Sequence, residues 1–146
     1  MKKLIAIILL LTTVFLFSCS TIDQVHSKAA KANELAEQFC FALSFDDIEK
    51  AKEYLHPDLR FKKGNLENYL KEFEADNDID FSNGVAIKTR FSERIVIYDS
   101  RYNGDVYTVG IKMVIGNKVL KLYFIIVDND KGYGLHDFGL YTYRPN

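Results

Sequence analysis

Three histidines are the side chains in this sequence best suited to acid–base chemistry near neutral pH. His56 precedes Pro57 at the expected end of a helix, where a donor or cation stabilises the negative helix terminus. It is either a structural residue or, alternatively, a catalytic residue at the rim of a pocket. His136 and Asp137 are neighbours in an expected strand and point to opposite faces, so they cannot form a side-by-side acid–base pair. His26 lies in an expected tether, and no catalytic set is predicted.

One acidic segment has part of the pattern of a metal site. Asp76, Asp78 and Asp80 alternate as in a calcium-binding loop, but the glycine and glutamate that an EF-hand requires are replaced by Phe81 and Ile87. A solvated loop is therefore predicted. The histidines lack zinc-ligand spacing, and glycine-rich phosphate or dinucleotide loops are absent from the sequence. These patterns predict neither a metal nor a cofactor.

The N-terminal segment has the features of an export signal. Two lysines precede an apolar run over residues 4–17, and Ser18 is a small residue directly before Cys19. The run is shorter than the roughly 20 apolar residues that span a membrane comfortably. With Leu16 three residues before the cysteine, the segment resembles a bacterial lipobox.

The lipobox resemblance implies a lipid-anchored protein of the cell envelope. Residues 1–18 would be a signal peptide, Cys19 would carry the lipid, and residues 19–27 would form a tether before a single domain over residues 28–146. The membrane is then a partner through the N-terminal lipid. In a bacterium with two membranes, Ser20 favours the outer membrane, facing the periplasm, because an aspartate at this position is the usual inner-membrane retention signal.

Charge and cysteine content further restrict the kinds of partner and the covalent bonds that we expect for this chain. Removing the two lysines of the signal reduces the 19 basic side chains to 17, against 20 acidic ones. The remaining basic residues are spread singly among acids, so nucleic acid is not expected as a partner. Acylation of Cys19 would leave Cys40 without a cysteine partner in the chain. Because Cys40 lies in a helical run, we expect it to be a small buried core residue; the alternative is a reactive thiol or an intermolecular disulfide.

Apolar residues at three- and four-residue spacing predict three amphipathic helices in the first half of the chain. The first runs from Ser27, as its cap, to Leu43. The second starts in a capping box formed by Ser44 and Asp47 and ends before Pro57. The third follows Asn65 and carries one apolar face, formed by Leu66, Tyr69, Leu70 and Phe73.

From Val85 onward the apolar pattern alternates, which predicts strands. Asn103 with Gly104, and Gly116 with Asn117, are typical of hairpin turns. We expect about five strands, over residues 85–91, 95–98, 106–115, 118–127 and 133–143.

Two long strands indicate where the core lies. In each, alternate residues give one continuous apolar face: Tyr107, Val109, Ile111, Met113 and Ile115, then Leu120, Leu122, Phe124 and Ile126. The second strand is also apolar on its other face, at Tyr123, Ile125 and Val127. Either a neighbouring element covers this face, or it is an interface with a second copy or an envelope protein.

These elements predict an α+β domain, with three N-terminal helices packed on a curved antiparallel sheet of about five strands. The order of these elements resembles that of the nuclear transport factor 2-like, or cystatin-like, superfamily. Three sequence segments add to the resemblance: Ala36 to Leu43 in the first helix, Tyr54 to Leu59 after the second helix, and Gly132 to Leu135 at the start of the last strand. The closest likeness is to small bacterial lipoproteins of unassigned function. The resemblance implies a cone-shaped domain.

The superfamily resemblance also implies a pocket between helices and sheet. Some members are isomerases or dehydratases that use a tyrosine from the first helix, but residues 27–43 contain no tyrosine. We therefore expect a domain that is non-enzymatic and binds a protein partner or a small apolar ligand; the alternative is a pocket enzyme of isomerase or dehydratase type. Side chains that could line the pocket, or else simply fill the core, are Phe39, Tyr54, His56, Phe61, Tyr69, Tyr107 and Phe124.

Overall fold

The structure is a computed structural model that describes residues 26–59 and 65–141, with Ser92 and Glu93 described by their backbone alone. The chain divides into two compact units, Met1–Lys31 and Ala32–Asn146. In the first unit, residues 26–31 are helical. Ser27 therefore lies within a helix and is not its N-terminal cap. Phe61 and Cys19 lie outside the described residues, and the features below belong to the second unit.

The predicted apolar stripe of the first helix is confirmed. Residues 32–44 are helical, and the stripe residues Ala32, Leu35, Ala36, Phe39 and Leu43 are all buried. Cys40 is buried beside them, and burial, followed by the neighbouring Glu37 carboxylate, raises the pKa of its thiol. A protonated, inaccessible thiol is unreactive, as expected for a small core residue.

The second helix, α2 (Ile48–Glu53), begins differently from the prediction. Asp47 is its N-cap, and its side chain accepts a hydrogen bond of 2.9 Å from the backbone N–H of Lys50. Ser44 instead ends the preceding helix by donating its hydroxyl to the carbonyl of Phe41, 2.8 Å away. The prediction that Ser44 and Asp47 form a capping box was therefore wrong, since the two residues cap different helix ends.

The third helix, α3 (Leu66–Asn77), ends at Asp78, which adopts a left-handed conformation. The acids of the following loop have structural roles: Asp78 pairs with Lys118 at 2.5 Å, and Asp80 caps the short 3-10 helix η2 (Phe81–Asn83). In the described part of the chain, no group of three or more His, Cys, Asp or Glu side chains is placed to hold a metal ion.

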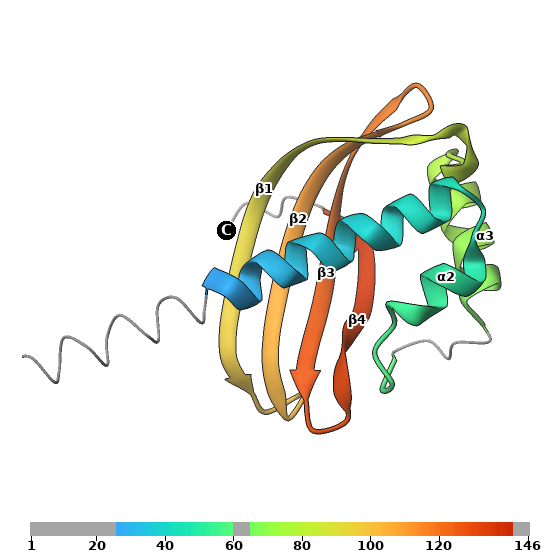
Figure 1. Cartoon of the computed structure of the whole chain (residues 1–146). Coiled ribbons are helices and arrows are strands. Elements are labelled where there is room, and N and C mark those ends of the chain that lie inside the picture. Colours follow the sequence, from blue (N-terminus) through green and yellow to red (C-terminus); the bar gives the residue numbers. More distant parts are fainter. Residues whose placement is uncertain (1–25, 60–64, 142–146) are drawn as a thin grey trace, which may run out of the picture. The chain divides into compact units, whose positions relative to one another are not determined.

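The α+β class, with helices preceding an antiparallel sheet, is confirmed. The sheet runs β1 (Val85–Asp99), β2 (Gly104–Ile115), β3 (Lys118–Asn129) and β4 (Gly132–Leu140), in that order (Figure 1). It has four strands among the described residues because the expected strands 85–91 and 95–98 are continuous in β1. Register shifts break the alternation in β1 between Ile87 and Thr89 and again before Ser92.

The sheet's inner face forms the core predicted from alternation. Tyr107, Val109 and Ile111 of β2 and Leu122, Phe124 and Ile126 of β3 are all buried. Phe138 of β4 lies among other rings, with centroid distances of 5.2 Å to Phe39, 5.2 Å to Tyr69, 5.4 Å to Phe73 and 6.1 Å to Phe124. This one side chain therefore joins the first helix, α3 and the sheet.

The helices also cover the outer edge of β4 (Figure 1). Leu55 forms an isolated parallel bridge with Leu135. Leu135 donates its N–H to the carbonyl of Tyr54 and accepts from the N–H of His56, both at 2.8 Å. Tyr69 of α3 donates its hydroxyl to the carbonyl of Phe138, also at 2.8 Å. The backbone groups of this edge are therefore satisfied by the segment after α2 and by α3.

Candidate functional site

His56 is fully buried and both of its ring nitrogens are engaged. Nδ1 accepts a hydrogen bond of 3.0 Å from the N–H of Asp58, while Nε2 lies 3.1 Å from the carbonyl oxygen of Gly132 and 3.1 Å from Oδ1 of Asn129. Because a carbonyl only accepts, the proton resides on Nε2. The ring therefore fastens the segment after α2 to the β3–β4 hairpin and leaves neither nitrogen available for a substrate.

His136 lies near His56, at a bulge in β4. Ile125 pairs with Asp137 and Ile126 with Leu135, so His136 is the additional residue. Its ring is 6.1 Å from that of His56 and 5.0 Å from the ring of Tyr102, which it meets edge-on. Its Nδ1 is buried without a hydrogen-bond partner.

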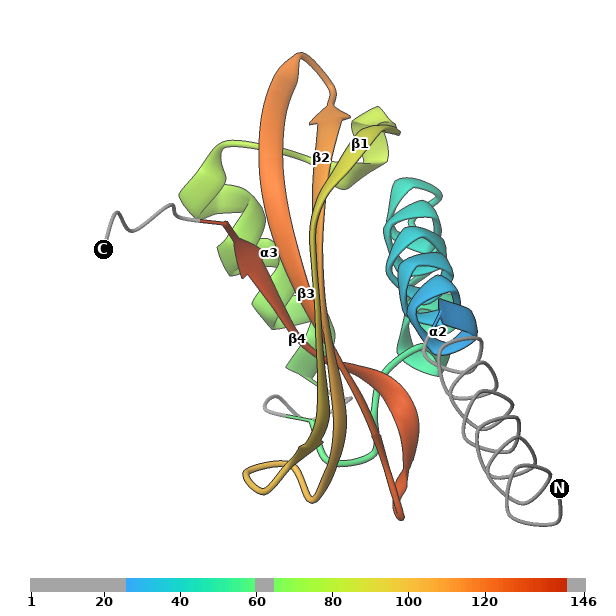
Figure 2. The ribbon, with the colours of Figure 1, turned by 90° about the vertical axis from the view of Figure 1, so that its left-hand side faces the viewer.

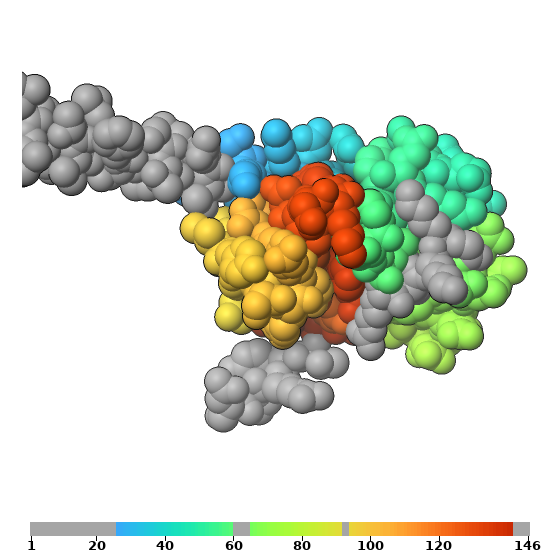
Figure 3. Space-filling view, turned by 90° about the horizontal axis from the view of Figure 1, so that it is seen from below, coloured from blue at the N-terminus to red at the C-terminus, as the bar shows by residue number. Residues whose placement is uncertain are grey.

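A polar cavity of about 310 Å³ opens beside His136. It lies between the two hairpins at one end of the sheet, drawn in yellow and red in Figure 3. The carboxylate of Asp58, which lines the cavity, forms an ion pair with Lys131 at 2.7 Å. Arg101 is likewise held by Asp99, at 2.6 Å. The charged side chains that line the cavity are thus each paired with an opposite charge, Asp58 with Lys131 and Arg101 with Asp99.

The environment of His136 predicts a pH dependence of stability. Burial, and next the adjacent His56, lower the pKa of His136 from its ordinary 6.5. The folded protein therefore binds this proton less tightly than the unfolded chain, so the contribution to stability is complete above pH 6.5 and is lost as the pH falls through the lowered pKa. We expect urea titrations to show a smaller free energy of unfolding at about pH 5 than at about pH 7. The loss should shrink in His136→Gln, and an unchanged loss in that variant would contradict the assignment.

The residues predicted to line a pocket are placed mainly in the core. Phe39, Tyr107 and Phe124 are buried there, and Tyr69 packs against them while its hydroxyl bonds to β4. Tyr54 is half-buried and lines a surface groove instead. Phe39, Tyr69 and Phe124 each contact the ring of Phe138, so these side chains fill the core.

That surface groove runs between the first helix and α2 and has a volume of about 350 Å³. We call it the aromatic groove; it is lined by Gln38, Phe41, Ala42, Phe45, Asp47, Lys50 and Tyr54. Phe45 is 81% exposed and Phe41 43% exposed. Four residues apart, they lie on one side of the chain, outside the buried stripe. Because two large apolar rings are exposed to water beside this groove, we consider it a candidate binding surface.

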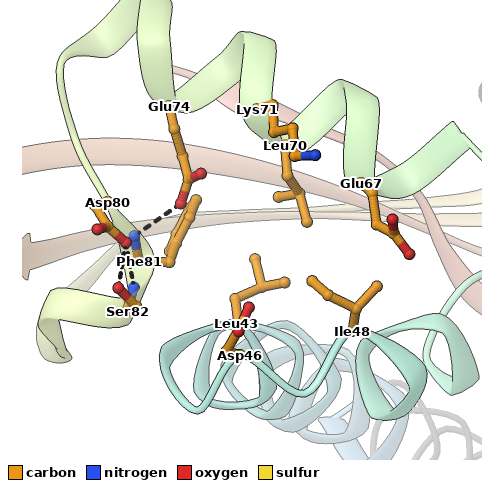
Figure 4. Close-up of a pocket in the computed structure, with 10 residues that line it drawn as sticks. All are labelled: Leu43, Asp46, Ile48, Glu67, Leu70, Lys71, Glu74, Asp80, Phe81 and Ser82. Carbon is orange, nitrogen blue, oxygen red and sulfur yellow. Dashed lines mark hydrogen bonds between the residues drawn. The ribbon is translucent and has the colours of Figure 1, made fainter.

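Another cavity, of about 280 Å³, lies between α3 and the turn before α2 (Figure 4). Its apolar side chains include Leu70 and Phe81, which are themselves buried. Two of the carboxylates around it have structural roles, because Glu74 accepts from the N–H of Phe81 at 2.9 Å and Asp80 accepts from the N–H of Ser82 at 2.8 Å. The bond from Phe81 to Glu74 attaches η2 to α3, and the bond from Ser82 to Asp80 caps η2, so the cavity is a crevice between packed elements.

The predicted interface lies on the outer face of the sheet. Val127 is fully buried, and Tyr123 and Ile125 are half-buried. The ring of Tyr123 lies against Gly139 of β4, where an added Cβ would be 2.9 Å from it. These side chains therefore cover the sheet's own backbone, with Tyr123 and Ile125 partly accessible.

Farther along the same face lies a basic patch, formed by Phe91, Lys112, Lys121 and Tyr141. Lys112 and Lys121 are direct cross-strand partners of β2 and β3. The ring of Tyr141 meets that of Phe91 edge-on at 4.8 Å, and Nζ of Lys121 is 5.5 Å from the centroid of Phe91. Among the side chains that the structure describes, which exclude that of Glu93, neither lysine forms an ion pair with a carboxylate.

The lysine pair predicts a stabilising substitution. Like charges directly opposite in a sheet repel, whereas opposite charges attract, each by about 0.2–1 kcal/mol. Lys112→Glu should therefore raise the free energy of unfolding by about 1 kcal/mol, and Lys112→Gln by about half as much. Urea titrations at low and high salt measure this difference, which should shrink with salt. Equal stability of Lys112→Glu and the parent at low salt would show that the two ammonium groups do not repel.

No family model and no curated protein matches this chain. Among the described residues, no helix combines the length and the apolar composition that a membrane span requires.

Sequence reasoning missed the aromatic groove and the basic patch. Phe41 and Phe45 fall outside the apolar stripe of the first helix, and this off-stripe position was a usable signal. The lysine pair could also have been predicted from the sequence, because a two-residue turn at Gly116 and Asn117 fixes the register that places Lys112 opposite Lys121.

Proposed function

We propose that this protein is a lipid-anchored domain of the cell envelope that binds a protein partner in its aromatic groove and has no catalytic role. The observation that carries the binding proposal is the exposure of Phe45 and Phe41 beside a hollow of about 350 Å³. The sequence of the first 19 residues supports the anchor, and the order of helices and sheet fits a nuclear transport factor 2-like domain.

The groove suits a protein partner better than a small ligand. It is open, and two of its rings project into water from the first helix and the turn that follows; Tyr54, the C-cap of α2, also lines it. Exposed aromatic anchors are typical of the few residues that carry most of a protein interface's binding energy. Asp47 and Lys50 supply charges at its margin, where polar rim contacts set orientation.

The absence of a catalytic role is inferred from how the candidate side chains are used. Both nitrogens of His56 are bonded within the fold, and Phe39, Tyr107 and Phe124 fill the core. The isomerase-type alternative requires a proton-transferring group that faces a substrate. His136 is the nearest candidate, and its Nδ1 is buried away from solvent.

Photo-crosslinking in living cells tests the groove. A benzophenone amino acid at position 38, which lines the groove, should give a discrete adduct with a partner or with a second copy of the chain. Phe45→Ser should weaken binding by about 2 kcal/mol, roughly thirtyfold, and remove the adduct. Ile97→Ser is the matched control, because Ile97 is 68% exposed on a different element, β1. No adduct, or equal loss in the control, contradicts the proposal.

The anchor is tested separately on the mature N-terminus. Mass spectrometry should find diacylglycerol and an acyl chain on Cys19, with both absent from Cys19→Ala. A free Cys19 thiol or an uncut chain contradicts lipidation. In a bacterium with two membranes, we expect the protein in the outer membrane, facing the periplasm, and Ser20→Asp should move it to the inner-membrane fraction.

A further inference from the structure

The basic patch is an isolated concentration of positive charge on the sheet. Residues two positions away along each strand share the same face. For Lys112 these are Gly110 and Val114, and for Lys121 they are Val119 and Tyr123. All four are uncharged, so the sheet provides the two ammonium groups with no acidic neighbour along β2 or β3.

Two ammonium groups side by side repel each other, and this repulsion is relieved when an anion lies across them. The backbone hydrogen bonds of the β2–β3 ladder hold the two residues directly opposite each other, so their flexible side chains reach the same area of the outer face. Lys121 is exposed and Lys112 half-buried, so both remain accessible from the outer face. The geometry therefore favours an anionic occupant.

The surroundings of the lysines indicate what kind of anion this is. Tyr141 is 38% exposed, Val119 is 59% exposed, and Phe91 is half-buried. Aromatic rings and lysines together are typical of surfaces at the boundary between lipid headgroups and acyl chains, where the rings enter the interface and the ammonium groups meet phosphates. A soluble anion would occupy the lysines alone and leave the apolar side chains in water.

We propose that the basic patch rests on an anionic lipid bilayer, and that this contact orients the domain on the membrane. The proposal deepens the proposed function, because a tethered domain needs only a weak contact to remain on the surface. The first helix lies along the other face of the sheet, as Figure 2 shows, and it provides one wall of the aromatic groove. A domain resting on its basic patch therefore leaves the groove open to a partner.

Fluorescence quenching by brominated lipid tests this orientation on the full chain. The sequence contains no tryptophan, so Tyr141→Trp reports from the patch and Phe45→Trp from the groove. Each purified variant is reconstituted into phosphatidylcholine bilayers with and without phosphatidylglycerol. We expect brominated lipid to quench the tryptophan at position 141 only in the anionic bilayers, and the tryptophan at position 45 in neither.

The lysines are tested in the Tyr141→Trp background. Each lysine contributes about fivefold to binding at an anionic surface, so Lys112→Gln with Lys121→Gln should weaken the contact about thirtyfold and abolish quenching. Lys52→Gln with Lys71→Gln removes the same charge from α2 and α3 and should leave quenching intact. Circular dichroism checks that each variant is folded, and removal of like charges from β2 and β3 should not impair folding.

Three results would overturn the proposal: equal quenching at position 141 in neutral bilayers, quenching that survives loss of Lys112 and Lys121, or stronger quenching at position 45. The readout does not depend on the chemistry of Cys19, because either the lipid or the apolar residues 4–17 hold the reconstituted chain in the bilayer. Failure here is therefore distinct from failure of lipidation, which the mass of the N-terminus measures, or of partner binding, which crosslinking measures.

Discussion

Replacing Phe138 with alanine is expected to lower the free energy of unfolding by about 3–5 kcal/mol. Its ring is buried and lies within 5.2–6.1 Å of the rings of Phe39, Tyr69, Phe73 and Phe124. Removing it leaves a cavity that faces two helices and the sheet, so no single element can move to fill it. Urea titration of the purified protein measures the change in midpoint.

A surface phenylalanine provides the matched control for this experiment. Phe45 is 81% exposed, so Phe45→Ala should change stability by less than about 0.5 kcal/mol. Phe138→Leu should have an intermediate effect, because it keeps apolar volume but loses the edge-to-face ring contacts. A loss below about 1 kcal/mol for Phe138→Ala would mean that the ring cluster does not join the helices to the sheet.

Gly134→Ala should destabilise the protein by about 3 kcal/mol or more, through backbone rather than side-chain contacts. A Cβ at this position would lie 2.6 Å from the nitrogen of His56 and 2.8 Å from the carbonyl carbon of Leu55. These atoms cannot rotate away, so the segment after α2 must move off β4. Both 2.8 Å hydrogen bonds to Leu135 would then be lost or weakened.

Gly139→Ala is the control for that substitution, in the same strand. A Cβ there would meet the ring of Tyr123 at 2.9 Å, and a side chain can shift where a backbone cannot. We therefore expect chemical unfolding to show less than half the loss seen for Gly134→Ala. Similar losses in both variants would show that crowding within β4, rather than the attachment of the helical segment, sets the cost.

The parts of the fold that sequence predicted are those governed by local period. Alternation placed Val109 and Ile111 of β2, and Phe124 of β3, on the buried face, where the structure has them. Helical spacing likewise identified Phe39 as a core residue. These predictions succeed because burial of one face imposes its period on each element independently.

The features that sequence did not predict depend on contacts between distant segments. The bridge between Leu55 and Leu135, and the fastening of His56 to Gly132, join segments far apart in sequence, and no local pattern specifies such a pairing. The bulge that inserts His136 also breaks the strict alternation assumed for the last strand. The aromatic groove exists only because α2 folds back beside the first helix.

The position of Phe138 in the chain also constrains the order in which this domain can form. Each hairpin of the sheet pairs neighbouring segments, whereas Phe39 contacts Phe138, and Leu55 pairs with Leu135, in β4, the last described strand. During synthesis the helices emerge first, and these contacts cannot form until β4 has followed. The attachment of the helices to β4 therefore forms late, when almost all of the chain is present.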